Sequence, residues 1–168
     1  MNTTQYGFEG SRLRKPVILD VDVGVDDALA ILLALYSPEL EIRAITTVSG
    51  NVHVDKTSVN ALKVLEAVGL SGFPVAKGMS KPLLRELEVA EDFHGKDGLG
   101  DSRLPEPKLS LDKRHAVDLL LEMTATERKQ VTVLASGPLT NIATAILRNP
   151  GLAEDAKELI IMGGAYGV

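Results

Sequence analysis

Apolar runs alternate with amphipathic stretches along this chain, and the alternation predicts strands and helices in turn. The expected strands are β-rich, largely apolar runs, mostly without polar alternation, at residues 17–21, 42–48, 73–76, 131–135 and 159–162. Continuous apolar strands are typical of a sheet that is covered on both faces. The expected helices carry apolar residues at helical spacing, at residues 27–36, 54–68, 115–125 and 139–148.

Helix-ending and helix-starting residues support these boundaries. Pro38 ends the first helix and Gly69 ends the second, whereas Asp112 precedes the third as a possible cap. His53 and His115 belong to no motif and are interpreted as structural or surface residues. Strand–helix alternation predicts one α/β domain over residues 1–168, with a mostly parallel, Rossmann-like open sheet and helices on both faces.

Residues 78–110 interrupt this regular alternation. The segment is long, charged and proline-containing, and no strand or long helix is predicted within it. A loop of this length in a compact domain is usually a functional flap or a disordered segment.

Composition narrows the function classes. A chain of 168 residues with 45% hydrophobic residues can build one core, and a net charge of −5 does not favour nucleic acid as a partner. The chain has no cysteine, which excludes disulfides and thiol catalysis. Residues 1–15 lack an apolar signal core, and the longest apolar run, residues 28–35, is too short to span a bilayer. We therefore expect a cytoplasmic protein without membrane association.

Four carboxylates stand within eight residues directly after the apolar run of residues 17–19, at Asp20, Asp22, Asp26 and Asp27. Carboxylates packed this closely repel each other, so they raise each other's pKa or bind a cation such as Ca²⁺ or Mg²⁺. Capping of the following helix would explain one of these residues but not all four.

Other polar and glycine motifs also follow expected strands. Residues 49–51 follow the second strand, Ser136 and Gly137 the fourth, and Gly163 and Gly164 the fifth. In open α/β sheets, ligands bind at the carboxyl ends of the strands. We therefore expect these motifs to meet the carboxylates around one crevice.

The stretch Asp20-Val21-Asp22-Val23-Gly24-Val25-Asp26-Asp27 resembles the metal-binding signature of the inosine-uridine preferring nucleoside hydrolases. The usual form of that signature is Asp-Thr-Asp-Pro-Gly-x-Asp-Asp, so Val21 and Val23 replace Thr and Pro here. Further blocks resemble family segments in the family's order, at residues 45–51, 56–65, 94–100, 136–141 and 161–165.

This resemblance implies the nucleoside hydrolase fold and Ca²⁺-dependent hydrolysis of the N-glycosidic bond of ribonucleosides, which yields ribose and free base. By matching positions, it implies that Asp22 binds Ca²⁺ and acts as general base toward a water on that ion. Asp27 would chelate the ion together with the Ser136 main-chain carbonyl. Asp20 would orient the loop without being a ligand.

The resemblance also implies a substrate site. Asp26 and Asn51 would hydrogen-bond the ribose hydroxyls, and Met162 would line the ribose pocket. His94 would lie near the nucleobase at the rim of the site, although a solvated loop histidine is an equal alternative. For Asn51 the alternative is a turn-forming residue after Gly50.

Two rival functions remain. A strand that ends in Asp-x-Asp also resembles the haloacid dehalogenase phosphatases, in which Asp20 would be the nucleophile, Asp22 the acid/base and Mg²⁺ the cofactor. Residues 162–166 lack the late acidic pair of that family, and Ile31 stands where an EF-hand needs its bidentate Glu. The other rival is a metal- or ribose-binding remnant, or an assembly subunit, without turnover.

Nucleoside hydrolases continue well beyond the point that matches Val168. The chain is therefore expected to be the N-terminal part of a longer domain, to bind Ca²⁺ weakly and to be a poor nucleosidase by itself. A homo-oligomer, dimer or tetramer, is expected, and the choice between purine and pyrimidine nucleosides stays open.

Overall fold

The computed structural model describes residues 14–164 and 167. It contains a parallel sheet of strands β1 (Lys15–Val21), β2 (Leu40–Thr47), β3 (Val75–Lys77), β4 (Thr132–Ala135) and β5 (Glu158–Ile161). Its helices are α1 (Val25–Tyr36), α2 (Val54–Ala67), α3 (Glu91–His94), α4 (Ala116–Thr126), α5 (Thr140–Arg148) and α6 (Leu152–Asp155).

The strands and long helices expected from the sequence are all present, with ends displaced by at most a few residues. The sequence did not predict α3 and α6, because a helix of four residues is too short to show helical periodicity. Segment 78–110 consists of loop apart from α3, as its composition indicates.

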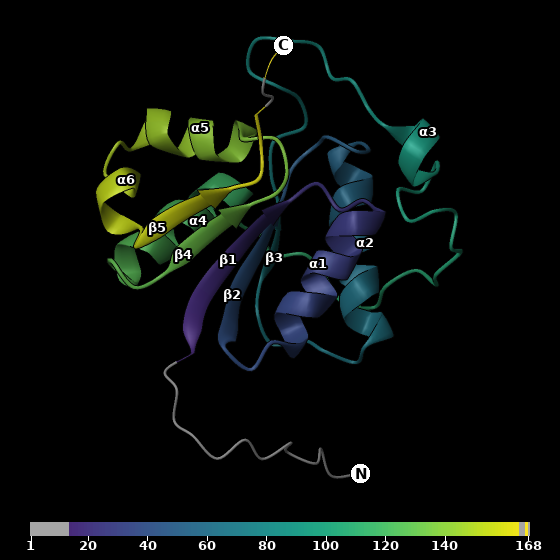
Figure 1. Cartoon of the computed structure of the whole chain (residues 1–168), viewed down its shortest axis with the longest axis horizontal. Helices are drawn as coiled ribbons and strands as arrows, with labels where there is room; N and C mark the ends of the chain where they lie inside the picture. The colour runs from purple at the N-terminus through teal and green to yellow at the C-terminus, as the bar shows by residue number, and fades with distance from the viewer. Residues whose placement is uncertain (1–13, 165–166, 168) are drawn as a thin grey trace.

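The order of the strands in the sheet is β3-β2-β1-β4-β5, and every neighbouring pair is parallel (Figure 1). The chain winds outward from β1 to β3 and then returns to pair β4 with the other side of β1. The carboxyl ends of β1 and β4 thus form the switch point where open α/β sheets bind ligands. The predicted fold class is confirmed.

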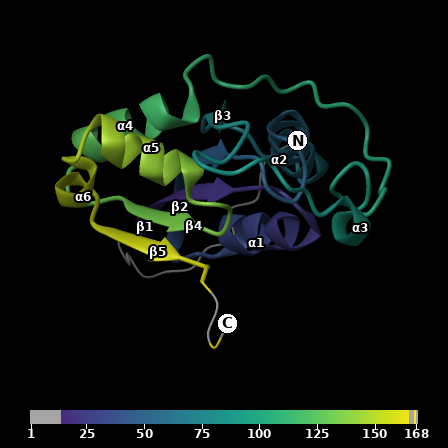
Figure 2. The same ribbon diagram turned by 90° about the horizontal axis from the view of Figure 1, so that it is seen from above.

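Helices cover both faces of the sheet, and alternation along β1 divides its side chains between them (Figure 2). Leu19 and Val21 pack with α1 and α2 in one core cluster, whereas Ile18 packs with α4 and α5 in another. Because alternate residues of a strand point to opposite faces, Asp20 belongs to the Ile18 face. The Asp20 side chain therefore points toward α5.

One helix start differs from the expectation. Asp112 does not cap α4: the cap is His115, whose Nδ1 accepts from the Val117 N–H at 3.2 Å. Asp112 instead accepts hydrogen bonds from Arg114, which lower the pKa of Asp112 to about 2. His53 caps α2 in the same way as His115 caps α4. Both histidines are therefore structural, as predicted.

The expectation that all strands are covered on both faces is wrong for β5. This strand is the sheet edge, and Leu159, Ile160 and Ile161 are all exposed. Apolar side chains are also exposed along the outer side of α1, at Leu29, Leu33 and Tyr36. An apolar run alone does not reveal whether a strand has a neighbour on its far side.

Among the residues that the structure describes, no helix has both the length and the apolar character that a membrane crossing requires.

The two aliphatic positions of α1 that differ most in burial provide a test of this packing. Ile31 is 0% exposed and Leu33 is 76% exposed. Ile31→Ala should lower the free energy of unfolding by roughly 2–5 kcal/mol, because it leaves a cavity between α1 and the sheet. Leu33→Ala should change it by less than about 0.5 kcal/mol. Urea denaturation of both variants measures this, and equal losses would contradict the assigned orientation of α1.

Candidate functional site

Three carboxylates meet at the carboxyl end of β1. Asp20 is in register with Thr46 of β2 and Ala135 of β4, and Asp22 lies two residues further on. Asp27 lies in the first turn of α1 and accepts from the Asp22 N–H at 3.2 Å and from Ser136 Oγ at 2.6 Å. Asp27 of α1 thus connects Asp22, which follows β1, to Ser136, which follows β4. The motifs converge at one edge of the sheet, as the strand-end argument predicts.

Asp20 is completely buried and is held by neutral donors. Its Oδ1 accepts from Thr46 Oγ1 at 2.5 Å and from Asn141 Nδ2 at 2.8 Å. Its Oδ2 is buried and has no hydrogen-bond partner. Burial raises the pKa of Asp20 from its usual value of 3.8 to about 6, against the lowering effect of both hydrogen bonds.

Asp22 is also buried, and its Oδ2 accepts from the Asn51 N–H at 2.8 Å. Burial, followed by repulsion from the Asp27 carboxylate, raises the pKa of Asp22 to about 7. The backbone approaches so closely that a Cβ at Gly50 would overlap Asp22 Oδ2. Only glycine at position 50 lets the Asn51 N–H reach this carboxylate.

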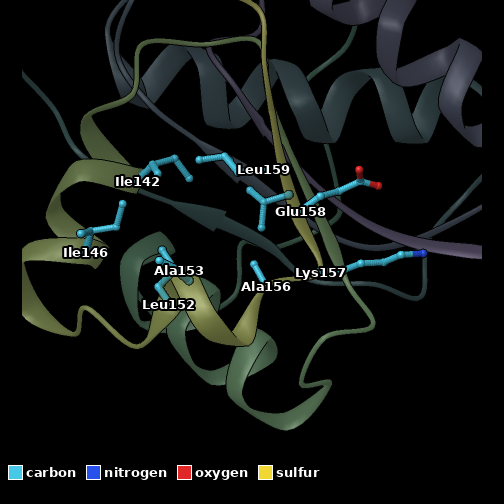
Figure 3. Close-up of a pocket in the computed structure, with 9 residues that line it drawn as sticks. Ile142, Ile146, Leu152, Ala153, Ala156, Lys157, Glu158 and Leu159 are labelled. Carbon is cyan, nitrogen blue, oxygen red and sulfur yellow. The ribbon is translucent and has the colours of Figure 1, made fainter.

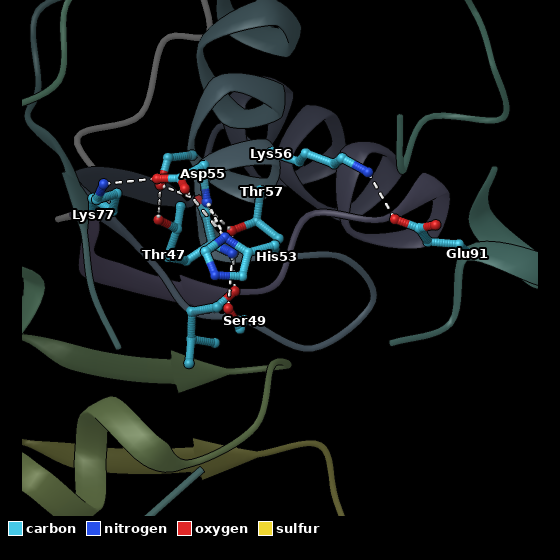
Figure 4. Close-up of polar contacts among 11 residues, drawn as sticks. Thr47, Ser49, His53, Asp55, Lys56, Thr57, Lys77 and Glu91 are labelled. Atoms are coloured by element: carbon cyan, nitrogen blue, oxygen red, sulfur yellow. Dashed lines mark hydrogen bonds and ion pairs between the residues drawn. The ribbon is translucent and has the colours of Figure 1, made fainter. Parts of the chain in front are cut away.

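The turn that carries Asn51 is fixed by side chains around the start of α2 (Figure 4). Ser49 Oγ accepts from the Val54 N–H at 2.7 Å, and Thr57 Oγ1 donates to the Val48 carbonyl at 3.0 Å. These bonds close the turn from both sides. The Asn51 N–H is therefore presented to Asp22 by a braced loop.

Asp26, Asn51 and His94 gather around Gly24, although they come from three separate segments. His94 Nδ1 accepts from the Val25 N–H at 3.3 Å and lies 3.7 Å from Asp26 Oδ1. A Cβ on Gly24 would be 2.6 Å from both His94 Nδ1 and Asn51 Nδ2. The Asp26 side chain remains 64% exposed. These polar groups thus line an open rim beside the buried carboxylates.

Met162 is placed less directly than the other expected site residues. Its N–H donates to the Ala135 carbonyl at 2.9 Å, which puts its backbone next to the residue before Ser136. Its side chain is 63% exposed. Met162 therefore lies on the same side of the sheet as the carboxylates, where the strands have their carboxyl ends.

The oxygen donors at the end of β1 are of the type that hard metal ions bind. The part of the chain that the structure describes contains no group of three or more His, Cys, Asp or Glu side chains placed to hold a metal. Asp22, Asp27 and the Ser136 carbonyl are nevertheless hard oxygen donors, which suit Ca²⁺ or Mg²⁺ rather than a softer metal. Ca²⁺ takes about 6–8 oxygens, so three such donors would supply fewer than half of the larger shell, and further oxygens would be needed to complete it.

Sequence reasoning assigned no role to Thr46 or Asn141, the two side chains that bind Asp20. Asn141 could have been noticed, because asparagine is unfavourable inside a helix and here stands among apolar residues of α5. Thr46 gave no comparable signal, since threonine is common in strands.

An apolar pocket of about 180 Å³ lies between β5, α5 and α6 (Figure 3). Its lining includes Ile142, Leu152 and Leu159, with Lys157 and Glu158 as charged members. The lining contains none of the carboxylates at the end of β1. It is therefore separate from the candidate site.

Comparisons with known proteins agree on the family. Residues 17–168 match the family model of the inosine-uridine preferring nucleoside hydrolases. The inosine-uridine preferring nucleoside hydrolase of Leishmania major is 45% identical over 154 residues, which are 90% of this chain and 49% of the relative. The pyrimidine-specific ribonucleoside hydrolase RihA of Salmonella arizonae is 44% identical over 153 residues, 91% of this chain and 49% of the relative.

Solved structures give the same picture. A purine-preferring ribonucleoside hydrolase from Gardnerella vaginalis superposes with a TM-score of 0.86 at 35% identity, covering 90% of this chain and 49% of that one. A plant nucleoside hydrolase superposes with a TM-score of 0.86 at 40% identity, covering 90% of this chain and 48% of that one. The chain spans about half the length of the curated relatives it matches.

These matches displace the phosphatase interpretation of the Asp-x-Asp strand end. The family model covers the carboxylate cluster, the turn after β2 and the end of β4, which are the segments that meet at the switch point. On sequence, on fold and on the order of its motifs, this chain belongs to the inosine-uridine preferring nucleoside hydrolase family.

Proposed function

We propose that this chain carries the ion-binding and ribose-binding part of a Ca²⁺-dependent ribonucleoside hydrolase, which cleaves the N-glycosidic bond to give ribose and free base. The observation that carries the proposal is the buried Asp22 carboxylate, joined to Asp27 and to the end of β4 at the switch point of a nucleoside hydrolase fold.

Asp22 has the properties of a general base in this reaction. Burial and the Asp27 carboxylate raise its pKa to about 7 in the ion-free protein. Bound Ca²⁺ would favour the ionised carboxylate, which is the form that accepts a proton. In the proposed step, the oxygen of water bonds to the anomeric carbon while the bond from that carbon to the base nitrogen breaks. One proton of the water passes to Asp22, and the base leaves with the electron pair of the broken bond and takes up a proton from solvent to become free base. Nearby carboxylates stabilise the positive charge that develops on the sugar.

Asp22, Asp27 and the Ser136 carbonyl are the groups that would hold Ca²⁺. The ion, when bound, would lower the pKa of water and align it. Asp27 is already positioned for this role by two donors, the Asp22 N–H and Ser136 Oγ. Asp20, which is buried beneath them, would keep the end of β1 in place.

Asp26 and Asn51 would bind the ribose hydroxyls, with Met162 lining the ribose pocket. The exposed Asp26 carboxylate is an acceptor, and the Asn51 amide offers both donors and an acceptor, which matches the mixed character of hydroxyl groups. His94 would lie near the base, because segment 78–110 brings it to the start of α1.

The substrate class is proposed as ribonucleosides of either base type. The relatives are described as inosine-uridine preferring, pyrimidine-specific and purine-preferring, so the shared part of their substrates is the ribose. We further propose that residues 1–168 form the N-terminal α/β part of a hydrolase domain that acts in the cytoplasm as a homo-oligomer, a dimer or tetramer. The exposed apolar side chains of α1 and β5 support association.

The alternative is an ion- and ribose-binding protein without turnover. It is favoured by the small number of charged ligands, because the described residues contain no group of three or more acidic, histidine or cysteine side chains placed to hold a metal, and the proposed ligands include only two carboxylates, Asp22 and Asp27. Ca²⁺ and ribose binding without base release from inosine or uridine would support this alternative.

The first test of the proposal concerns the ion. Calorimetric titration of the chelated protein with Ca²⁺ should show one weak site, and Asp27→Ala should abolish the binding by removing a carboxylate ligand. Asp118→Ala is the matched control, since Asp118 of α4 pairs with Arg148 of α5 rather than with a group of the carboxylate cluster. Equal affinity in Asp27→Ala and parent would show that Asp27 is not a ligand.

The second test concerns Asp22. Asp22→Asn should preserve the fold and lower kcat for base release by a factor on the order of 10² or more, the scale of general-base catalysis. Ca²⁺ occupancy is measured alongside, so that a loss of ion is not counted as a loss of the base. A variant with full Ca²⁺ occupancy and parental turnover would remove Asp22 from the mechanism.

The third test concerns the pH dependence of stability without the ion. The folded pKa values of Asp20 and Asp22, about 6 and about 7, lie above the ordinary value of 3.8. Their contribution to stability is therefore full below pH 3.8 and is lost as pH rises through 6 and 7. Urea unfolding of chelated protein should show this decline between about pH 4.5 and about pH 8.

The matched variants Asp20→Asn and Asp22→Asn should each flatten that decline, because an amide does not ionise. Saturating Ca²⁺ should raise stability most at the upper end of the range, since it binds the ionised carboxylates. A decline of unchanged slope in both variants would assign the effect to other groups.

A further inference from the structure

Asn141 is completely buried in the first turn of α5, and its amide makes three hydrogen bonds to three different segments. Nδ2 donates to Asp20 Oδ1 at 2.8 Å and to the Thr47 carbonyl at 3.0 Å. Oδ1 accepts from the Met79 N–H at 2.9 Å. One side chain thus joins the end of β1, the end of β2 and the start of segment 78–110.

The start of segment 78–110 is shaped to reach this amide. A Cβ on Gly78 would overlap both Asn141 Oδ1 and the Thr47 carbonyl, so the backbone passes directly against the side chain. The Met79 carbonyl accepts from the Ser49 N–H at 3.0 Å. Met79 is therefore held on one side by α5 and on the other by the loop that carries Asn51.

The chemistry of an amide is required at position 141. Two of its contacts need a donor and the third needs an acceptor, which asparagine supplies from one planar group. Aspartate has the same shape but would place an oxygen against Asp20 Oδ1 and against the Thr47 carbonyl. It would keep only the bond from the Met79 N–H.

We propose that Asn141 is a positioning residue of the ion site. Its amide sets the place of the Asp20 carboxylate beneath Asp22 and, through Met79, the place of the segment that carries His94. The inference rests on the proposed function, because it assumes that Asp22 and Asp27 hold the ion. It concerns a residue that touches neither the ion nor the nucleoside.

Three variants separate the contact of Asn141 with Asp20 from its contact with Met79. Both readouts are made on the purified chain without an activity assay. Ca²⁺ affinity is measured by calorimetry, and the exchange rate of the Met79 amide hydrogen is measured in the metal-free protein. Asn141→Ala removes both the bond to Asp20 and the bond from the Met79 N–H. Asn141→Asp removes the bonds that the amide donates but keeps the bond from Met79. Thr46→Val removes the hydroxyl that also donates to Asp20. Thr124→Val is the control, since this buried hydroxyl bonds only within α4.

Asn141→Ala should weaken Ca²⁺ binding by about 10-fold or more, the usual effect of removing a group that orients an ion-binding region. It should also speed Met79 exchange by about 10-fold relative to the Thr124→Val control, through loss of one hydrogen bond. Asn141→Asp and Thr46→Val should weaken Ca²⁺ binding while Met79 exchange stays close to parental. If Asn141→Ala does not fold, these two variants carry the test.

Parental Ca²⁺ affinity in both Asn141→Asp and Thr46→Val would overturn the proposal, as would a Met79 exchange rate in Asn141→Ala equal to that of Thr124→Val. Failure of the parent chain to bind Ca²⁺ at all would instead count against the proposed function. In that case the Met79 exchange rates still decide whether Asn141 holds the start of segment 78–110.

Discussion

The structure depends on burying three carboxylates at the switch point of the sheet and compensating them with neutral donors. Asp20, Asp22 and Asp27 lie on consecutive structural elements, and like charges this close oppose one another as well as their own burial. The donors that reach them are two side-chain hydroxyls, one amide and two backbone N–H groups, from Thr46, Ser136, Asn141, Asn51 and Asp22. The segments at the carboxyl ends of β1, β2 and β4 are placed so that they supply these donors.

Close backbone approach is the second requirement, and it explains where glycine is needed. Gly50 lets the Asn51 N–H reach Asp22, and Gly78 lets segment 78–110 pass against Asn141. A Cβ on Gly137 would be 2.9 Å from the backbone nitrogen of Asp22. Side chains at these positions would push apart the strand ends that the hydrogen bonds draw together.

Compensation by neutral donors is incomplete, and this connects stability to function. Asp20 Oδ2 remains buried without a partner, and the raised pKa values of Asp20 and Asp22 mean that these carboxyl groups ionise less readily in the metal-free protein than in solvent. A cation would reverse this balance, because it favours the ionised carboxylates.

The sequence by itself determined the strands, the long helices, their order and the class of sheet, because hydrophobic periodicity is a local property. It also identified Asp20, Asp22 and Asp27 as a cluster, since they are close along the chain. Tertiary structure alone decided that β5 is an exposed edge strand and that Asn141 meets Asp20 across 121 residues. These contacts depend on which strands become neighbours and on which face each side chain points to. That information exists only once the sheet has assembled.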